Sequence, residues 1–198
     1  MSVTKLPFVS VDDLKRTVDT RPADWRSPRD VDVSGLEQEL RRNVEGEVRF
    51  DAGSKAMYAV DAGNYRQVPI GVVIPKSKAD VVQTINACRR FGAPLLSRAG
   101  GTSIPGQTCN AAIVMDWSKY MHGVLEINTQ ERWARVLPGT VCDTLRDQAM
   151  QQSNNLLVWG PDPATHTHCC FGGMIGNNSC GAHAQMSGRC DNNVEELE

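Results

Sequence analysis

The chain has 198 residues, enough for one domain of ordinary size with a buried core. Its 21 basic and 23 acidic residues give a net charge of −2, which argues against nucleic acid as the main partner. Hydrophobic residues make up 40% of the chain, so disorder is not expected. No apolar run approaches the roughly 20 residues of a membrane-spanning helix; the longest cover 70–75 and 111–117.

The first ten residues, MSVTKLPFVS, lack an uninterrupted apolar stretch, so no secretory signal is expected. The seven cysteines are an odd count, and none form a C-x-x-C pair. Reduced thiols and a cytoplasmic location are therefore expected. Peripheral association with a membrane is left open.

Residues 1–64 are expected to form a charged N-terminal extension, and residues 65–198 a separate domain. Within 11–50, 10 acidic and 8 basic side chains nearly balance. One amphipathic helix is predicted here. Ser34 and Glu37 have capping-box spacing, Leu36, Leu40 and Val44 form an apolar stripe, Glu37 and Arg41 can pair, and Gly46 is a plausible stop. Such a surface helix usually serves packing.

A strand–helix–strand unit follows. Gly71–Pro75 is a short apolar run typical of a buried strand. Ser77 and Asp80 predict a helix N-terminus, Val81, Val82, Ile85 and Cys88 share one helical face, and Gly92 ends that helix. Pro94–Ser97 predicts a second buried strand, parallel to the first with a right-handed crossover.

The later strands are predicted to be antiparallel. Short apolar segments at 112–115, 123–127 and 132–137 are separated by polar turns. Thr140 and Asp143 predict the start of a helix that carries Val141, Leu145 and Ala149. The predicted class is α+β, with a small parallel βαβ subdomain and an antiparallel subdomain.

Three glycine-bearing segments are candidate binding sites. Residues 98–107, RAGGTSIPGQ, follow the second predicted strand, at the sheet edge where α/β proteins bind ligands. Their amides can converge on an anion as a nest, helped by the Thr102 and Ser103 hydroxyls and the charge of Arg98. Neither a Walker ending nor G-x-G-x-x-G is present, so a phosphate site and an ordinary tight loop remain alternatives.

The other two segments are 136–140, VLPGT, and a late pair, GPDPAT at 160–165 and GGMIGNNSCG at 172–181. The second segment alone resembles many strand–turn–helix junctions. In the late pair, two prolines fix a rigid turn around Asp162, and the glycine run suits a backbone that lies close to a flat or extended cofactor.

A metal site is not predicted. Histidines and cysteines are frequent between 166 and 190, but their spacing is not that of zinc ligands. Small thiols packed near a cofactor are the preferred interpretation. No G-x-S-x-G nucleophile motif is present, and nothing specific supports a Cys/His pair.

Taken in order, the segments VVIPKSKADVV, PLLSRAGGTSIPGQ, RVLPGT, GPDPATHTHCCFGGMIGNNSCG and GRCDNNVEELE resemble the FAD-binding (PCMH-type) domain of the vanillyl-alcohol oxidase / p-cresol methylhydroxylase flavoproteins. The stretches DAGNYRQVPIGVVIP and CNAAIVMDWSKY are most similar to the FAD-linked oxidases of the glycolate oxidase / D-lactate dehydrogenase branch. The resemblance runs from about Phe50 to the end of the chain.

The resemblance implies a set of cofactor-binding residues. The loop from Arg98 to Gly106 would hold the FAD pyrophosphate, and Gly188 to Val194, including Asn192, would close over the nucleotide. The full set is Arg98, Ala99, Gly100, Gly101, Thr102, Ser103, Gly106, Gln107, Pro138, Gly139, Pro161, Asp162, Pro163, Thr165, Gly172, Gly173, Ile175, Gly176, Asn178, Ser179, Gly181, Asp191 and Val194.

Two departures from the family pattern matter. Thr102 occupies the position of a histidine that links FAD covalently in some members, so noncovalent binding is expected. Ala99 replaces a common glycine, and Pro105 is unusual. The chain also stops where the next strand of the family begins, so the domain is expected to be incomplete. Catalytic residues stay unassigned, a structural role is preferred for His183, and an iron–sulfur cluster would belong to a missing C-terminal part.

The resemblance therefore implies an FAD-dependent dehydrogenase or oxidase, or its N-terminal part, that oxidises a 2-hydroxy acid such as D-lactate, glycolate or D-2-hydroxyglutarate by hydride transfer to FAD. The electron acceptor and oligomeric state stay open. One alternative is a noncatalytic FAD- or nucleotide-binding fragment. Another is a metal-binding redox protein based on the late cysteines and histidines.

Overall fold

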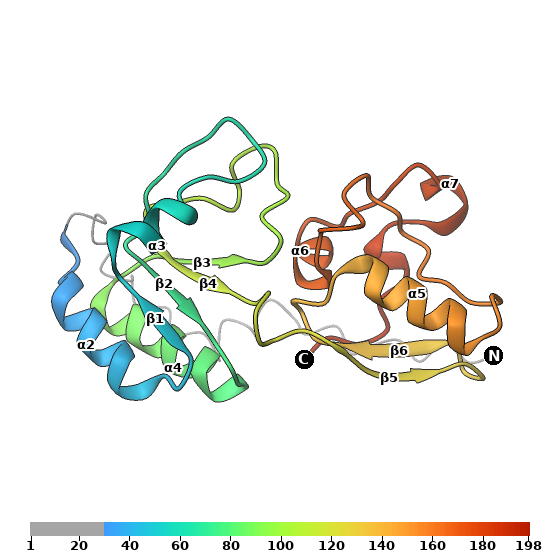
Figure 1. The fold of residues 1–198 in the computed structure, drawn as a ribbon, viewed down its shortest axis with the longest axis horizontal. Coiled ribbons are helices and arrows are strands. Elements are labelled where there is room, and N and C mark those ends of the chain that lie inside the picture. The colour runs from blue at the N-terminus through green and yellow to red at the C-terminus, as the bar shows by residue number, and fades with distance from the viewer. Residues whose placement is uncertain (1–29) are drawn as a thin grey trace, which may run out of the picture.

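The computed structural model describes residues 30–198. The segment without a secretory signal and most of the charged stretch lie outside these residues. The described chain forms two lobes, joined by a linker at residues 117–123 (Figure 1). In chain order the elements are α2 (Val33–Asn43), β1 (Glu47–Arg49), α3 (Ala52–Met57), β2 (Gly71–Ile74), α4 (Lys78–Phe91), β3 (Leu95–Arg98), β4 (Ile113–Asp116), β5 (Val124–Asn128), β6 (Trp133–Val136), α5 (Cys142–Gln152), α6 (Phe171–Gly176), α7 (Ala184–Ser187) and the 3-10 turn η2 (Cys190–Asn192).

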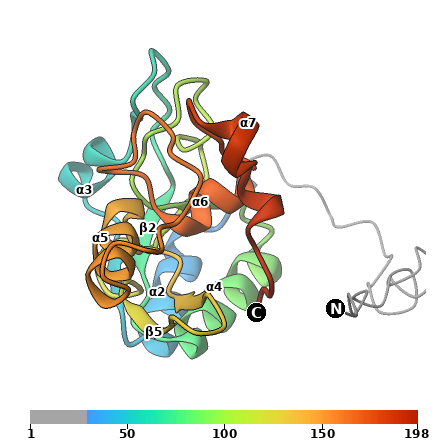
Figure 2. The same cartoon turned by 90° about the vertical axis from the view of Figure 1, so that its right-hand side faces the viewer.

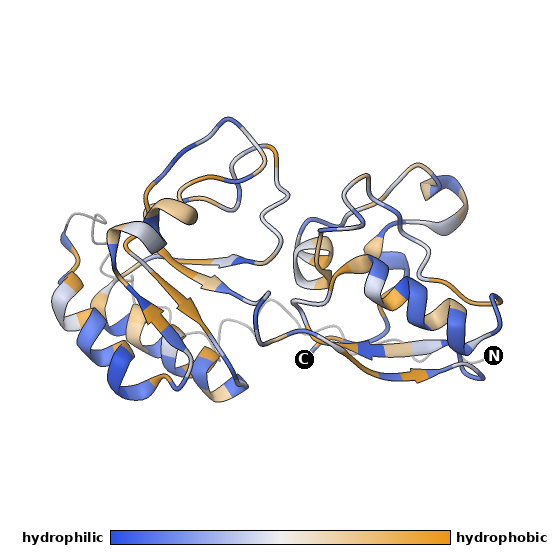
Figure 3. Ribbon diagram, viewed as in Figure 1, coloured by the Kyte–Doolittle hydropathy of each residue, from blue (hydrophilic) through white to orange (hydrophobic). Residues whose placement is uncertain are grey.

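The first lobe contains a four-stranded sheet in the order β1-β2-β4-β3. β2 and β3 are both parallel to β4, which confirms the predicted parallel unit, while β1 is antiparallel to β2. The antiparallel assignment for 112–115 was wrong, because β4 is the central parallel strand. All four β4 residues are buried, as they are in β2. This burial of every residue is typical of strands covered on both faces, and Figure 3 shows both strands as mainly hydrophobic.

The second strand of the unit is less buried than predicted. β3 lies at the edge of the sheet, where its residues alternate between exposed and half-buried. Leu95, for example, is 38% exposed. β3 is therefore an edge strand whose carboxyl end leads directly into the 98–108 loop.

α2 packs against α4 on one face of the sheet, as Figure 2 shows from the side. Leu36 and Leu40 are fully buried, and Glu37 pairs with Arg41 at 2.8 Å, as predicted. The predicted ends were wrong. Asp32 caps the helix by accepting from the amide of Gly35 at 3.0 Å, ahead of the predicted box at Ser34, and the helix ends at Asn43 rather than at Gly46.

α4 begins and ends as predicted. The Ser77 hydroxyl accepts from the amide of Asp80, and Gly92 has φ 64° at the C-terminus. The predicted apolar face was wrong, because Val82 and Ile85 are 53% and 45% exposed. The buried residues are Asp80, Thr84, Ala87 and Cys88.

The Asp80 carboxylate explains this orientation of α4. It accepts from the backbone amides of Glu45, Gly46 and Lys76 at 2.8–3.0 Å. These bonds join the α2–β1 turn to the start of α4. Because a buried carboxylate needs such donors, they fix which face of α4 is buried.

In the second lobe, β5 and β6 form the predicted antiparallel pair. α5 carries the expected buried Leu145 and Ala149, but Val141 rather than Thr140 is its N-cap. Thr140 does not cap the helix because its hydroxyl bonds to the backbone of Gly123 in the linker, accepting from N at 2.8 Å and donating to O at 3.0 Å. Cys142, Cys169, Met174 and Cys190 form the buried cluster of this lobe. None of the described helices is long and apolar enough to cross a membrane.

Replacing Asp80 with alanine should destabilise the protein by about 2–4 kcal/mol, because three backbone amides lose their acceptor. Urea unfolding would measure the change. Asp147→Ala is the matched control, because Asp147 is exposed on α5 and should change the free energy of unfolding by less than about 0.5 kcal/mol. Equal effects of the two substitutions would contradict the role of Asp80.

Candidate functional site

A cavity of about 450 Å³ lies where the two lobes meet, between the 98–108 loop, the linker and the start of α5. Its lining residues are Ala99, Gly100, Ser118, His122, Gly139, Thr140, Val141, Thr144, His168 and Cys170. Three of them, Ala99, Gly100 and Gly139, are among the site residues predicted from sequence. The cavity therefore joins the first two glycine-bearing segments.

The remaining predicted site residues do not line this cavity. They are Arg98, Gly101, Thr102, Ser103, Gly106, Gln107, Pro138, Pro161, Asp162, Pro163, Thr165, Gly172, Gly173, Ile175, Gly176, Asn178, Ser179, Gly181, Asp191 and Val194. Their contacts place many of them in the same two walls, as follows.

Residues 98–108, here called the glycine loop, have the backbone geometry of an anion nest. Gly101 and Gly106 have φ of 62° and 79°, in the left-handed region that favours glycine. Within residues 30–198, the backbone amides of Gly101, Thr102 and Ser103 make no hydrogen bond. A run of free amides beside left-handed glycines is a binding surface for phosphate oxygens.

Arg98 does not extend toward those amides. Its Nη1 donates to the carbonyl oxygens of Val60 at 2.7 Å and Thr108 at 3.0 Å. Its guanidinium also stacks over the ring of Tyr58, 5.3 Å from the centroid. Arg98 therefore fixes the two ends of the glycine loop rather than offering an open fork to an anion.

Glycines also allow the segments to pack closely. A Cβ at Gly100 would lie 2.3 Å from the carbonyl oxygen of His168, and one at Gly139 would lie 2.2 Å from that of Trp117. The second and third segments are paired through the amide of Gly172, which donates to the carbonyl of Pro138 at 2.8 Å. At Gly173 and Gly176 a Cβ would meet nothing within 4 Å, so this side of α6 is open.

The late segments form one connected wall. The Asp162 carboxylate accepts from Nδ1 of His183 at 2.5 Å, and this bond lowers the pKa of Asp162. A Cβ at Gly181 would lie 1.9 Å from the carbonyl oxygen of Asp162. The side chain of Asn178 accepts from the amide of Asp191 at 3.0 Å. Asp162 and His183 thus hold the proline-flanked turn against the glycine run.

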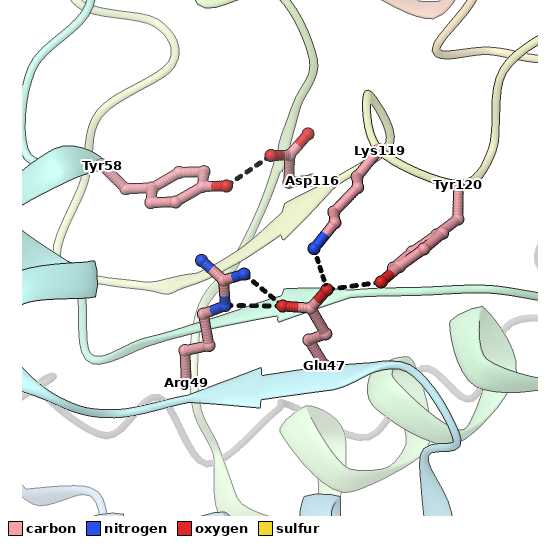
Figure 4. Close-up of polar contacts among 6 residues, drawn as sticks. All are labelled: Glu47, Arg49, Tyr58, Asp116, Lys119 and Tyr120. Atoms are coloured by element: carbon pink, nitrogen blue, oxygen red, sulfur yellow. Dashed lines mark hydrogen bonds and ion pairs between the residues drawn. The ribbon is translucent and has the colours of Figure 1, made fainter.

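Sequence reasoning did not find the linker residues Ser118 and His122. Figure 4 shows how their segment is attached to the first lobe. Lys119 and Tyr120 both donate to the Glu47 carboxylate, Tyr120 at 2.6 Å, and Arg49 pairs with its other oxygen. These bonds, first that from Lys119, lower the pKa of Glu47 to about 2. No motif marks such a linker, so its contribution could not be predicted.

Asp116, at the end of β4, precedes the linker. It accepts from the hydroxyl of Tyr58 at 2.5 Å and from the amide of Ser118 at 2.8 Å (Figure 4). Burial of Tyr58, followed by this bond, raises the pKa of its hydroxyl. Tyr58 and Asp116 thus join the start of the linker to the segment before β2.

The thiols near the cavity are free and mainly neutral. Burial raises the pKa of Cys170, in the cavity wall, to about 11. A hydrogen bond between the Cys142 and Cys169 thiols raises the pKa of Cys142 and lowers that of Cys169. No group of three or more His, Cys, Asp or Glu side chains in residues 30–198 is arranged to hold a metal ion.

Residues 69–198 match the family model described as "FAD binding domain". The chain belongs to this family. It is 33% identical over 165 residues to D-2-hydroxyglutarate dehydrogenase of Pseudomonas putida, a match that covers 82% of the chain and 16% of that protein. It is 30% identical over 173 residues to glycolate oxidase subunit GlcD of Escherichia coli K12, covering 85% of the chain and 34% of that protein. Family and relatives confirm the resemblance found in the sequence.

Solved structures confirm the fold. An alkyldihydroxyacetonephosphate synthase matches with a TM-score of 0.70 at 17% identity, covering 80% of this chain and 32% of that chain. 6-Hydroxy-D-nicotine oxidase of Arthrobacter nicotinovorans matches with a TM-score of 0.61 at 24% identity, covering 74% and 31%. p-Cresol methylhydroxylase matches with a TM-score of 0.57 at 18% identity, covering 73% and 28%. The chain spans 15% to 34% of the length of the curated relatives it matches.

Glu47→Gln should remove part of the acid dependence of stability. Because the folded pKa of about 2 lies below the ordinary value of 4.5, this carboxylate stabilises the fold above pH 4.5, and that contribution is lost as the pH falls toward 2. The substitution should flatten the decline in this range and cost about 1 kcal/mol at pH 7.

Urea unfolding at pH values from 2 to 7 would test this. Glu126→Gln on exposed β5 is the matched control and should keep the wild-type profile. If Glu47→Gln loses as much stability on acidification as the wild type, the bonds to the linker do not carry this stabilisation.

Proposed function

We propose that this chain binds FAD noncovalently between its two lobes, with the diphosphate on the free amides of Gly101, Thr102 and Ser103. The glycine loop carries this proposal, because left-handed glycines beside unpaired donors suit a double anion. The open side of α6 at Gly173 and Gly176 offers space for an extended ligand. Thr102 cannot supply the imidazole that a histidyl linkage to flavin requires, which supports noncovalent binding.

The other predicted residues would act in two ways. Gly100, Gly139, Gly172 and Gly181 would let the walls approach closely enough to hold the ligand on both sides. Arg98, Asp162 and Asn178 would position the loops, because their side chains are bonded to neighbouring groups. The full set named from the sequence, through Asp191 and Val194, stays part of this proposal.

In this proposal the chain is the flavin-binding part of an oxidoreductase that acts on a 2-hydroxy acid. The relatives named D-2-hydroxyglutarate dehydrogenase and glycolate oxidase support this class. Bound FAD would supply a hydride acceptor. This chain's own residues would hold it, exclude water and keep a neutral Cys170 thiol beside it. We also propose a cytoplasmic location, supported by seven free cysteines.

A second candidate is an FAD-binding piece without turnover of its own. The share of the relatives' length that the chain spans, 15% to 34%, favours it. Both candidates require FAD binding. A 2-hydroxy acid that bleaches the flavin of the isolated chain under anaerobic conditions would support the enzyme, and an unchanged spectrum would support the noncatalytic piece.

The isolated chain should take up FAD at close to one per protein and show a flavin spectrum after gel filtration. Acid precipitation should release the flavin into solution, because no covalent bond is expected. A colourless protein would contradict FAD binding, and flavin retained in the precipitate would contradict noncovalent attachment.

Gly101→Ala should raise the dissociation constant for FAD about tenfold or more, because alanine is strained at φ 62° and its Cβ would meet Arg98. Titration of FAD followed by flavin fluorescence would measure it. Gly53→Ala, in α3, is the control, because its Cβ would meet only a side-chain oxygen at 3.3 Å. Equal affinities for the two variants would contradict placement of the ligand at the glycine loop.

A further inference from the structure

Residues 58–65, here called the brace, run beside the glycine loop above the sheet. Figure 1 shows the two segments side by side, and hydrogen bonds join them along their length. The brace precedes residue 69, where the match to the family begins. No residue of the brace is among the site residues predicted from the sequence.

The first connection is made by Arg98. Its Nη1 donates to the carbonyl of Val60 in the brace and to that of Thr108 at the end of the glycine loop. The same guanidinium lies over the ring of Tyr58. One side chain thus joins the brace to both ends of the loop.

The second connection is a pair of hydrogen bonds. The amide of Ala62 donates to the carbonyl of Gly101 at 3.1 Å. The hydroxyl of Thr108 donates to one oxygen of the Asp61 carboxylate at 3.3 Å, while the other oxygen accepts from the amide of Gly63 at 2.8 Å. With its carbonyl held, the peptide that follows Gly101 has a fixed orientation, and with it the amide of Thr102.

The third connection is steric. A Cβ at Gly63 would lie 1.9 Å from the carbonyl oxygen of Ile104. A Cβ at Gly106 would lie 2.7 Å from the ring of Tyr65. The two backbones are therefore packed as closely as glycine permits.

We propose that the brace is a positioning element that sets the conformation of the glycine loop and thereby its affinity for the FAD diphosphate. This inference rests on the proposed function. The glycine loop has no helix or strand after Arg98, so ordering it on ligand binding costs conformational entropy. A loop that is already held in the binding conformation avoids most of that cost and binds more tightly.

Gly63→Ala tests the brace directly. Gly63 does not have a positive φ, so alanine does not strain its own backbone, yet its Cβ must push Ile104 away. Hydrogen–deuterium exchange of the FAD-free chain should be at least about tenfold faster at the loop amides 101–109, with wild-type exchange in α4. The dissociation constant for FAD should rise about tenfold, and Gly53→Ala should match the wild type in both measurements.

A second pair of variants keeps the test decisive if Gly63→Ala does not fold. Thr108→Val removes the hydroxyl that donates to Asp61, whereas Thr108→Ser keeps it. The valine variant should show faster loop exchange and weaker FAD binding, and serine should restore both. Equal behaviour of valine and serine would overturn the proposal.

The measurements separate this inference from the proposed function. Wild-type loop exchange in Gly63→Ala would overturn the brace, whatever the FAD affinity. Faster exchange with unchanged FAD affinity would overturn its role in binding. If the wild-type chain does not bind FAD, the proposed function fails and takes the assigned ligand with it, while the exchange data still decide whether residues 58–65 fix the loop.

Discussion

The hydrogen bonds of Arg98 are the constraint on which the candidate site depends. Arg98 ends β3, pairs in register with Asp116 at the end of β4, and carries a guanidinium bonded to carbonyls of the brace and of the glycine loop. Tyr58 stacks on that guanidinium and donates to Asp116. Bonds from a charged donor are stronger than bonds between neutral groups. They join three chain segments at one sheet edge, and the amides of the glycine loop are left free as a consequence.

Close backbone contacts complete what Arg98 begins. Gly100 against His168 joins the first lobe to the second, and Gly139 against Trp117 joins the second lobe to the linker. In each case a Cβ would lie within 2.3 Å of a carbonyl oxygen. Glycine is used here for its small size, whereas at Gly101 and Gly106 it is used for its left-handed conformation. The cavity between the lobes exists because these contacts hold its walls at a fixed separation.

The parts that could be predicted from sequence are those that local patterns determine. Apolar runs marked β2 and β4, and Ser77 with Gly92 marked both ends of α4. The place of β4 between β2 and β3 could not be predicted, because the 99–112 connection contains no helix to indicate a parallel crossover. The buried face of α4 was missed because Asp80, a charged residue, is directed inward by three distant backbone amides. Ser118 and His122 were missed because tertiary contacts, not a motif, bring them to the cavity.

The structural unit around the site begins before the matched family region. β1 supplies Glu47, which holds the linker, and residues 58–65 supply the acceptors of Arg98 and the contact with Ile104. The boundary expected at residue 65 therefore separates segments that are bonded to one another. Loops that bind ligands are usually positioned by a rigid scaffold. In this chain part of that scaffold precedes the domain whose loop it holds, so the conformation of the glycine loop is determined by residues on both sides of the family boundary.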